Sequence, residues 1–109
     1  MGDDEYSVLI IDLFRHEPEA DYVINGFPNF ELAKEFARRW VRDSVEEQRK
    51  PGQSGEDLRR MWHTFGEDAS VLDGEPHYAG SHELDYFVEH PATPEERDWQ
   101  AIKKLAGLS

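Results

Sequence analysis

Residues 29–50 read NFELAKEFARRWVRDSVEEQRK, a long stretch in which apolar and charged residues recur with the period of a helix. The apolar positions form a single stripe, made of Leu32, Ala33, Phe36, Ala37, Trp40, Val41 and Val45. Asn29 is a residue type that caps a helix by accepting a hydrogen bond from a first-turn amide. Pro51-Gly52 breaks the pattern. The sequence therefore predicts one amphipathic helix that needs an apolar surface to cover.

The face of this helix opposite the stripe is charged. Glu35 precedes Arg39 by four residues, an order that favours an ion pair. Lys34, Arg38 and Arg42 line up as a basic row, a candidate contact for an acidic partner, a nucleic-acid backbone or a second copy of the chain. A solvated face is the simpler interpretation, because acids on the same helix balance the row; these are Glu31, Glu35, Asp43, Glu46 and Glu47.

The surface for the helix to cover is expected from the residues before it. Residues 6–14 (YSVLIIDLF) and 22–27 (YVINGF) are rich in β-branched and aromatic side chains, which favour strands. Their short polar connection predicts an antiparallel pair. Apolar residues fall on both parities of 6–14, so this strand is expected to be central or covered on both faces.

A second helix is predicted after the break, with Ser54 as its cap. Its apolar stripe consists of Leu58, Met61, Trp62 and Phe65. Gly66 follows where a left-handed cap is common. Residues 67–92 are harder to interpret: Val71-Leu72 suggests a short strand, and 81–90 fits either a helix or a strand, with the helix favoured.

A last helix is predicted at the C-terminal end. Thr93-Pro94-Glu95-Glu96 has the pattern of a capping box with proline in the first helical position. The expected apolar face is Trp99, Ile102, Leu105 and Ala106. The three tryptophans of the chain each lie on the stripe of a different predicted helix, which indicates one shared core.

These elements predict one α+β domain over residues 1–109, with residues 1–5 disordered. A small antiparallel sheet of two or three strands would pack against amphipathic helices, in the order ββαα(β/α)α. Two strands alone are marginally stable, so the helices or a third strand are needed to complete the fold.

The charge of the chain restricts its partners. Twenty-four Asp and Glu face twelve Lys and Arg, a net charge of −12. Residues 1–28 hold seven acids and one base, and residues 67–98 hold ten acids and one base, whereas 29–66 is nearly balanced. Such a field opposes direct binding to nucleic acid or an anionic membrane and favours basic partners. The absence of cysteine excludes disulfides and Cys-ligated metals.

The first residues are acidic and the longest apolar run is Val8–Ile11. A signal peptide or a membrane span needs a positive start or a much longer apolar run. A soluble cytoplasmic protein without a membrane partner is therefore expected. The oligomeric state is left open.

Candidate metal ligands were sought among the five histidines, His16, His63, His77, His82 and His90. If 81–90 is helical, His82, Asp85 and Glu89 share one face, but Tyr86 stands where a second histidine of a zinc motif would lie. Four acids in residues 67–75 lack the ligand order of a calcium loop. No serine lies in a nucleophile motif and no glycine pattern fits a phosphate loop. No metal, cofactor or catalytic residue is expected.

Two short motifs carry a resemblance: Tyr22-x-x-x-Gly26-Phe27 in the second strand, and Phe65-Gly66-Glu67-Asp68 after the Ser-capped helix. With their intervening helix they resemble a family of small bacterial proteins that has no assigned activity, over about residues 6–68. The resemblance implies a stand-alone cytoplasmic domain. It draws attention to Asp12 and to Glu67-Asp68, and it implies no catalytic role for them.

Three functions remain open at this point. The first is a small acidic interaction or regulatory module that binds another protein without catalysis, with Lys34, Arg38, Arg42, Glu67 and Asp68 as candidate contacts. The second is a mimic of a nucleic-acid surface that occupies a basic partner. The third is a small enzyme that uses histidines and carboxylates as acid and base, which would need a strongly shifted pKa in a cleft.

Overall fold

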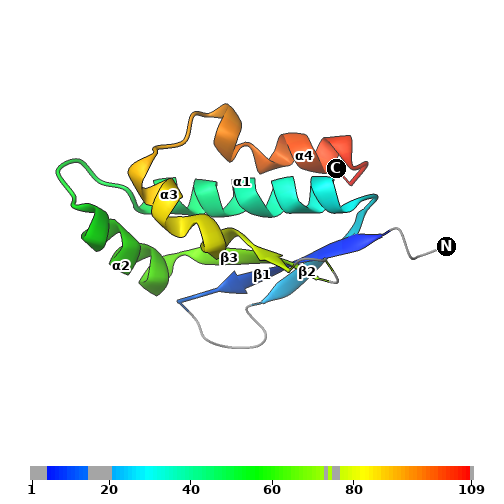
Figure 1. The fold of residues 1–109 in the computed structure, drawn as a ribbon, viewed down its shortest axis with the longest axis horizontal. Helices are drawn as coiled ribbons and strands as arrows, with labels where there is room; N and C mark the ends of the chain where they lie inside the picture. The colour runs from blue at the N-terminus through cyan, green and yellow to red at the C-terminus, as the bar shows by residue number, and fades with distance from the viewer. Residues whose placement is uncertain (1–4, 15–20, 73, 75–76, 109) are drawn as a thin grey trace.

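The computed structural model of this chain describes residues 5–14, 21–72, 74 and 77–108. It is an α+β fold in which a four-stranded antiparallel sheet, ordered β2-β1-β3-β4, packs against helices (Figure 1). The predicted fold class is confirmed. The predicted two or three strands are wrong, because residues 67–79 add two strands to the sheet. The exact order ββαα(β/α)α is not confirmed: its first four elements and its last helix are present, but two strands and a helix lie between them. Residues 1–4, most of the predicted 15–21 connection, and His16 lie outside the described residues.

The sheet is built around β1 (Tyr6–Asp12), which lies between β2 (Tyr22–Phe27) and β3 (Glu67–Leu72). Its predicted central position is confirmed by antiparallel pairing on both sides. Val8 and Ile10 point to the core and are fully buried, whereas Leu9 and Ile11 on the other face are half-buried. The short β4 (Tyr78–Ala79) extends the sheet beyond β3.

Helix α1 (Phe30–Gln48) runs across the core face of this sheet (Figure 1). Asn29 caps it as predicted, with its side-chain oxygen accepting from the amide of Leu32 at 2.9 Å. Five members of the predicted stripe are fully buried, namely Ala33, Phe36, Ala37, Val41 and Val45. The period of the sequence therefore gave both the helix and its buried face.

Helix α2 (Gly55–Phe65) begins where Ser54 accepts a hydrogen bond from the amide of Asp57. Only half of its predicted stripe is buried, because Phe65 is 45% exposed. Gly66 does not take the predicted left-handed conformation; its φ is −87°. Glycine is required there for space, since a Cβ would lie 2.3 Å from the Trp62 ring.

The C-terminal third crosses back over α1. Residues 80–89 form the turn η3 (Gly80–Glu83) and the helix α3 (Leu84–Glu89), so the helical alternative is confirmed. Thr93 and Glu96 form the predicted capping box, but it opens only the short turn η4 (Glu95–Arg97). Asp98 caps a separate helix, α4 (Trp99–Leu105), which packs along α1. The predicted burial of Leu105 is wrong, because its side chain is 71% exposed.

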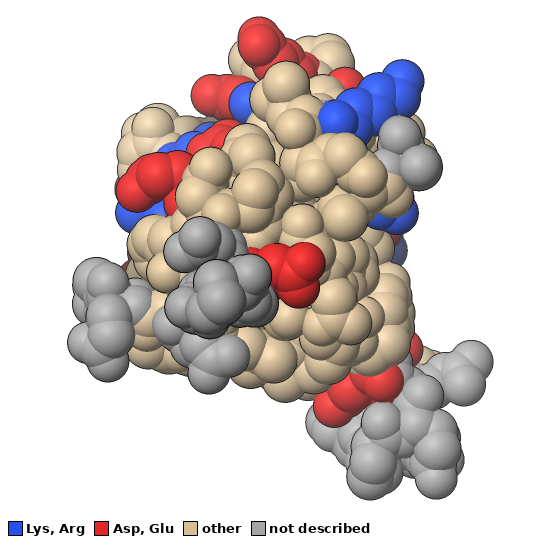
Figure 2. All heavy atoms as spheres, turned by 90° about the vertical axis from the view of Figure 1, so that its right-hand side faces the viewer, with Lys and Arg blue, Asp and Glu red and all other residues tan. Residues whose placement is uncertain are grey.

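The surface is unevenly charged. At the end of the molecule on the right of Figure 1, uncharged residues occupy much of the surface, with an acidic side chain near its middle and further charged side chains towards its edges (Figure 2). None of the described helices is both long and apolar enough to cross a membrane.

Candidate functional site

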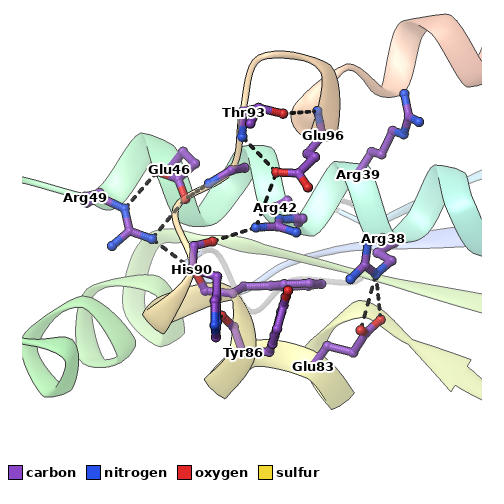
Figure 3. A network of polar contacts seen from close by, with 12 residues as sticks. Arg38, Arg39, Arg42, Glu46, Arg49, Glu83, Tyr86, His90, Thr93 and Glu96 are labelled. Carbon is purple, nitrogen blue, oxygen red and sulfur yellow. Dashed lines mark hydrogen bonds and ion pairs between the residues drawn. The ribbon is translucent and has the colours of Figure 1, made fainter.

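The predicted basic row on α1 is largely covered: Arg42 is buried, and Lys34 and Arg38 are only partly exposed. Residues 83–96 fold over it, and its arginines hold that segment in place (Figure 3). The Arg38 Nε lies 3.0 Å from Oε2 of Glu83, and the Lys34 ammonium lies 5.4 Å from the centre of the Tyr78 ring. The interpretation of this row as a solvated face is therefore wrong for Arg42, whereas Lys34 and Arg38 keep part of their surface in contact with solvent.

Arg42 is the most buried charged residue of the row, with 3% exposure. Its Nη2 donates to the carbonyl oxygen of His90 at 2.6 Å and lies 3.9 Å from a Glu96 oxygen. Its guanidinium carbon is 4.9 Å from the Phe87 ring centre and 5.8 Å from that of Tyr86. The guanidinium thus ties α3 and the following loop to α1.

Arg49 adds a second tie near the end of the same helix. It donates to the carbonyl oxygens of Phe87 and Val88 and to both oxygens of Glu46. Glu46 also accepts from the amide of Ala92. Burial opposes the charge on Glu46, but these hydrogen bonds outweigh burial and lower its pKa below the ordinary value.

A first cavity, of about 510 Å³, lies beside the N-terminal half of α1. Its lining mixes both signs of charge, with Glu31, Lys34, Glu35, Arg38, Tyr78, His82 and Glu83. The Tyr78 hydroxyl donates to Glu83 at 2.6 Å. Burial and that bond raise the pKa of Tyr78, so its hydroxyl stays protonated and acts as a donor. Within this cavity Arg38 and Glu83 pair with each other, and Glu35 pairs with Arg39 outside it.

A second cavity, of about 140 Å³, lies where α1, β3 and the start of α4 meet. It is lined by Trp40, Asp43, Ser44, Glu47, Glu67 and Trp99. Three of these six residues are carboxylates and two are tryptophans. We name it the acidic tryptophan cavity.

Both tryptophans of this cavity are fixed by its carboxylates. The Trp40 indole N–H donates to Glu67 at 3.0 Å, and that of Trp99 donates to Asp43 at 3.2 Å. The two ring centres are 4.5 Å apart, and the Tyr22 ring lies edge-on to Trp40 at 6.4 Å. As predicted, all three tryptophans join one core, with Trp62 inside it and the other two packed against it.

The carboxylates of the cavity are unequally satisfied. Asp43 is paired with the Arg97 Nε at 2.7 Å. Glu67 accepts from Trp40, while Glu47 has no hydrogen-bond or ion-pair partner among the described residues. Burial, followed by the nearby charge of Asp43, raises the pKa of Glu47. Burial and the charge of Glu67 likewise raise the pKa of Tyr22. The local field is therefore negative.

The other candidate site residues are dispersed. His82 lines the first cavity, Asp85 pairs with Arg59, and Glu89 lies at the exposed end of α3. Within the described part of the chain, no three histidines or carboxylates are placed to hold a metal ion.

The two neighbouring acids of β3, Glu67 and Asp68, point to opposite sides of the sheet, because successive strand residues alternate between its two faces. Glu67 reaches the acidic tryptophan cavity on the α1 side. Asp68 accepts instead from the amides of Ala69 and Ser81. Asp12 accepts from the amide of Phe14 in the turn that follows β1.

The sequence interpretation missed Asp43, Glu47 and Trp99 as a site. A signal was present, because Trp40, Asp43 and Glu47 are spaced three and four residues apart and so share one flank of a helix. Comparisons of the chain with models of known families, with curated proteins and with solved structures found no match. The resemblance to a bacterial family therefore stays a prediction.

Proposed function

We propose that this protein is a small, non-catalytic interaction or regulatory module that binds a basic segment of a protein partner. The observation that carries the proposal is that the arginines are ion-paired within the chain. Each of the seven arginines in the described residues is ion-paired with a carboxylate of the same chain; they are Arg38, Arg39, Arg42, Arg49, Arg59, Arg60 and Arg97.

This internal pairing of the arginines leaves the surface with a net negative charge. Acids outnumber bases by two to one in the whole chain, so pairing every arginine still leaves an excess of carboxylates. An excess of this kind attracts basic surfaces and repels anionic ones over about one Debye length, roughly 8 Å at physiological salt. The acidic tryptophan cavity adds aromatic surface to that charge, which suits a protein partner more than a simple counterion.

The catalytic alternative has less support. It requires a group with a pKa shifted towards neutrality inside a cleft. The pKa of Glu47 is raised in that direction, but no described histidine lines its cavity, and the two other carboxylates there are held by Trp40, Trp99 and Arg97. Tyr78 is strongly shifted, but the shift keeps its hydroxyl protonated and bound to Glu83. Its role is therefore to anchor η3 rather than to exchange protons.

Peptide binding tests the proposal. Fluorescence anisotropy would compare a labelled peptide rich in lysine and arginine with a peptide of equal length rich in glutamate, and with duplex DNA. We expect saturable binding of the basic peptide alone, weakened as salt is raised. Failure to bind the basic peptide at low salt, or equal binding of DNA, would refute the proposed function.

A further inference from the structure

The acidic tryptophan cavity has a charge imbalance that a ligand would correct. Asp43, Glu47 and Glu67 line it, and Arg97 is the cation paired with one of them. The Glu47 carboxylate has no polar partner among the described residues. The Glu47 side chain is exposed to solvent but lies in the same cavity as two like charges, which disfavour its ionised form, and a cation in the cavity would relieve that cost.

The two tryptophans indicate that the cation is an organic group. Both indole N–H groups donate to carboxylates of the cavity, so each ring is held in a fixed orientation next to a negative charge. Tryptophan is the side chain whose ring attracts organic cations most strongly, within about 6 Å of its centre. Guanidinium and ammonium groups with attached methylenes can use both the rings and the carboxylates.

A metal ion fits the site less well. Hard cations need several oxygen ligands that converge at short distance. In the described residues no group of three carboxylates or histidines converges in this way, and the indole walls offer no ligand oxygen. The carboxylates surround a space without meeting at a point.

The size of the cavity limits the ligand to a small group. Sites for whole small molecules usually measure about 300–1,000 Å³. This cavity measures about 140 Å³, which suits the end of one side chain. The ligand is therefore one cationic group, attached to a longer partner that lies outside.

We infer that the acidic tryptophan cavity binds a single organic cation, the guanidinium or ammonium group of an arginine or lysine side chain. The inference rests on the proposed function and deepens it, because this side chain would be the anchor of the basic partner. The Glu47 carboxylate supplies an ion pair, Trp40 and Trp99 supply the aromatic wall, and Glu67 completes the negative side.

The three indole N–H signals in a nitrogen–proton NMR spectrum provide a direct test. The ligands would be N-acetyl-arginine methylamide and N-acetyl-lysine methylamide, with N-acetyl-glutamate methylamide as the opposite charge. Variants Trp40→Phe and Trp99→Phe would assign the signals. We expect saturable shifts of the Trp40 and Trp99 signals with either cation. The Trp62 signal should shift less than the other two, because that indole is buried and touches the cavity only through its hydrogen bond to Ser44.

A matched pair of variants separates the cavity from the overall charge. Glu47→Gln and Glu89→Gln each remove one exposed carboxylate, but Glu89 lies on α3 outside the cavity. Glu47→Gln should weaken binding of the free cation and of the basic peptide about fivefold or more, which corresponds to roughly 1 kcal/mol. Glu89→Gln should change it less than twofold, on the order of the screened effect of a distant charge.

The outcomes distinguish the inference from the function on which it rests. If the basic peptide binds but Glu47→Gln has no larger effect than Glu89→Gln, the cavity inference falls and the proposed function stands. If neither the cations nor the peptide bind, the cavity inference and the proposed function are both refuted. Equal shifts of all three indole signals would indicate a diffuse charge effect and would also overturn the inference.

Discussion

The removal of the Arg42 side chain tests how the C-terminal third is held to α1. In Arg42→Ala the hydrogen bond to the His90 carbonyl is lost, and a bond of this charged type contributes about 1.5–3 kcal/mol. The stacking of the guanidinium on Phe87 contributes about 1–2 kcal/mol when buried. The long ion pair to Glu96 adds little, because that carboxylate is half exposed.

One feature of Arg42 reduces the net stabilisation that its side chain provides. Its Nε is buried and has no hydrogen-bond partner among the described residues, which costs part of what the other contacts contribute. We therefore expect a net loss of about 3–4 kcal/mol in the free energy of unfolding, near the range for disrupting a buried ion pair. A domain of this length is stable by about 5–15 kcal/mol, so the variant should still fold.

Urea unfolding followed by circular dichroism would measure the loss. The control is Arg60→Ala, because Arg60 is 66% exposed and pairs within one helix; its loss should be under about 0.5 kcal/mol. Hydrogen exchange should also increase in residues 84–96 of the Arg42 variant, since this segment loses its tie. A loss under about 1 kcal/mol, or one equal to that of the control, would refute a stabilising role for the buried guanidinium.

Three further predictions concern stability. Gly66→Ala should shift the tryptophan fluorescence and cost about 1–3 kcal/mol through overpacking against Trp62. Gly52→Ala meets no neighbouring atom but places a side chain at a φ of +76°, so it should cost about 1–2 kcal/mol through backbone strain and leave the fluorescence unchanged. The pKa of Glu46 is lowered by folding, so its contribution to the free energy of unfolding is present above about pH 4.5 and is lost as the pH falls further. Acid unfolding curves should therefore show a weaker pH dependence for Glu46→Gln than for the parent. The pKa of Glu47 is raised by folding, so its charge opposes folding at neutral pH. Urea unfolding should find Glu47→Gln at least as stable as the parent at pH 7. Any gain in stability should be lost below about pH 4, where the parent carboxyl is protonated in both states.

The local elements of this fold were readable in the sequence because their signals lie within a few residues. Asn29, the stripe of α1 and the cap at Ser54 each involve positions three or four residues apart. The sheet was only partly readable. β3 is recognisable as a strand by its pairing with β1, whose residues lie about sixty positions earlier in the chain, and its first two residues are acids that favour no strand.

The fate of the basic row shows the same limit at the level of a site. Nothing near Arg42 in the sequence indicates that His90 and Phe87 cover it, since they lie more than forty residues away. A charged residue on the polar side of an amphipathic helix is normally solvated. Here tertiary packing overrides that rule, because α3 and the loop after it need a surface and the arginines supply hydrogen bonds to their carbonyl groups.

Helix α1 therefore carries different chemistry on the two flanks of its buried stripe. At 3.6 residues per turn, Arg38, Arg42 and Arg49 fall on one flank, and Trp40, Asp43 and Glu47 fall on the other. The arginines of the first flank form hydrogen bonds that hold residues 83–90 against α1. On the second flank Glu47 has no internal partner in the described residues, although its pKa shows that its charge opposes folding. A charge that costs stability and has no hydrogen-bond or ion-pair partner in the described part of the chain is a reason to look for its partner outside the chain.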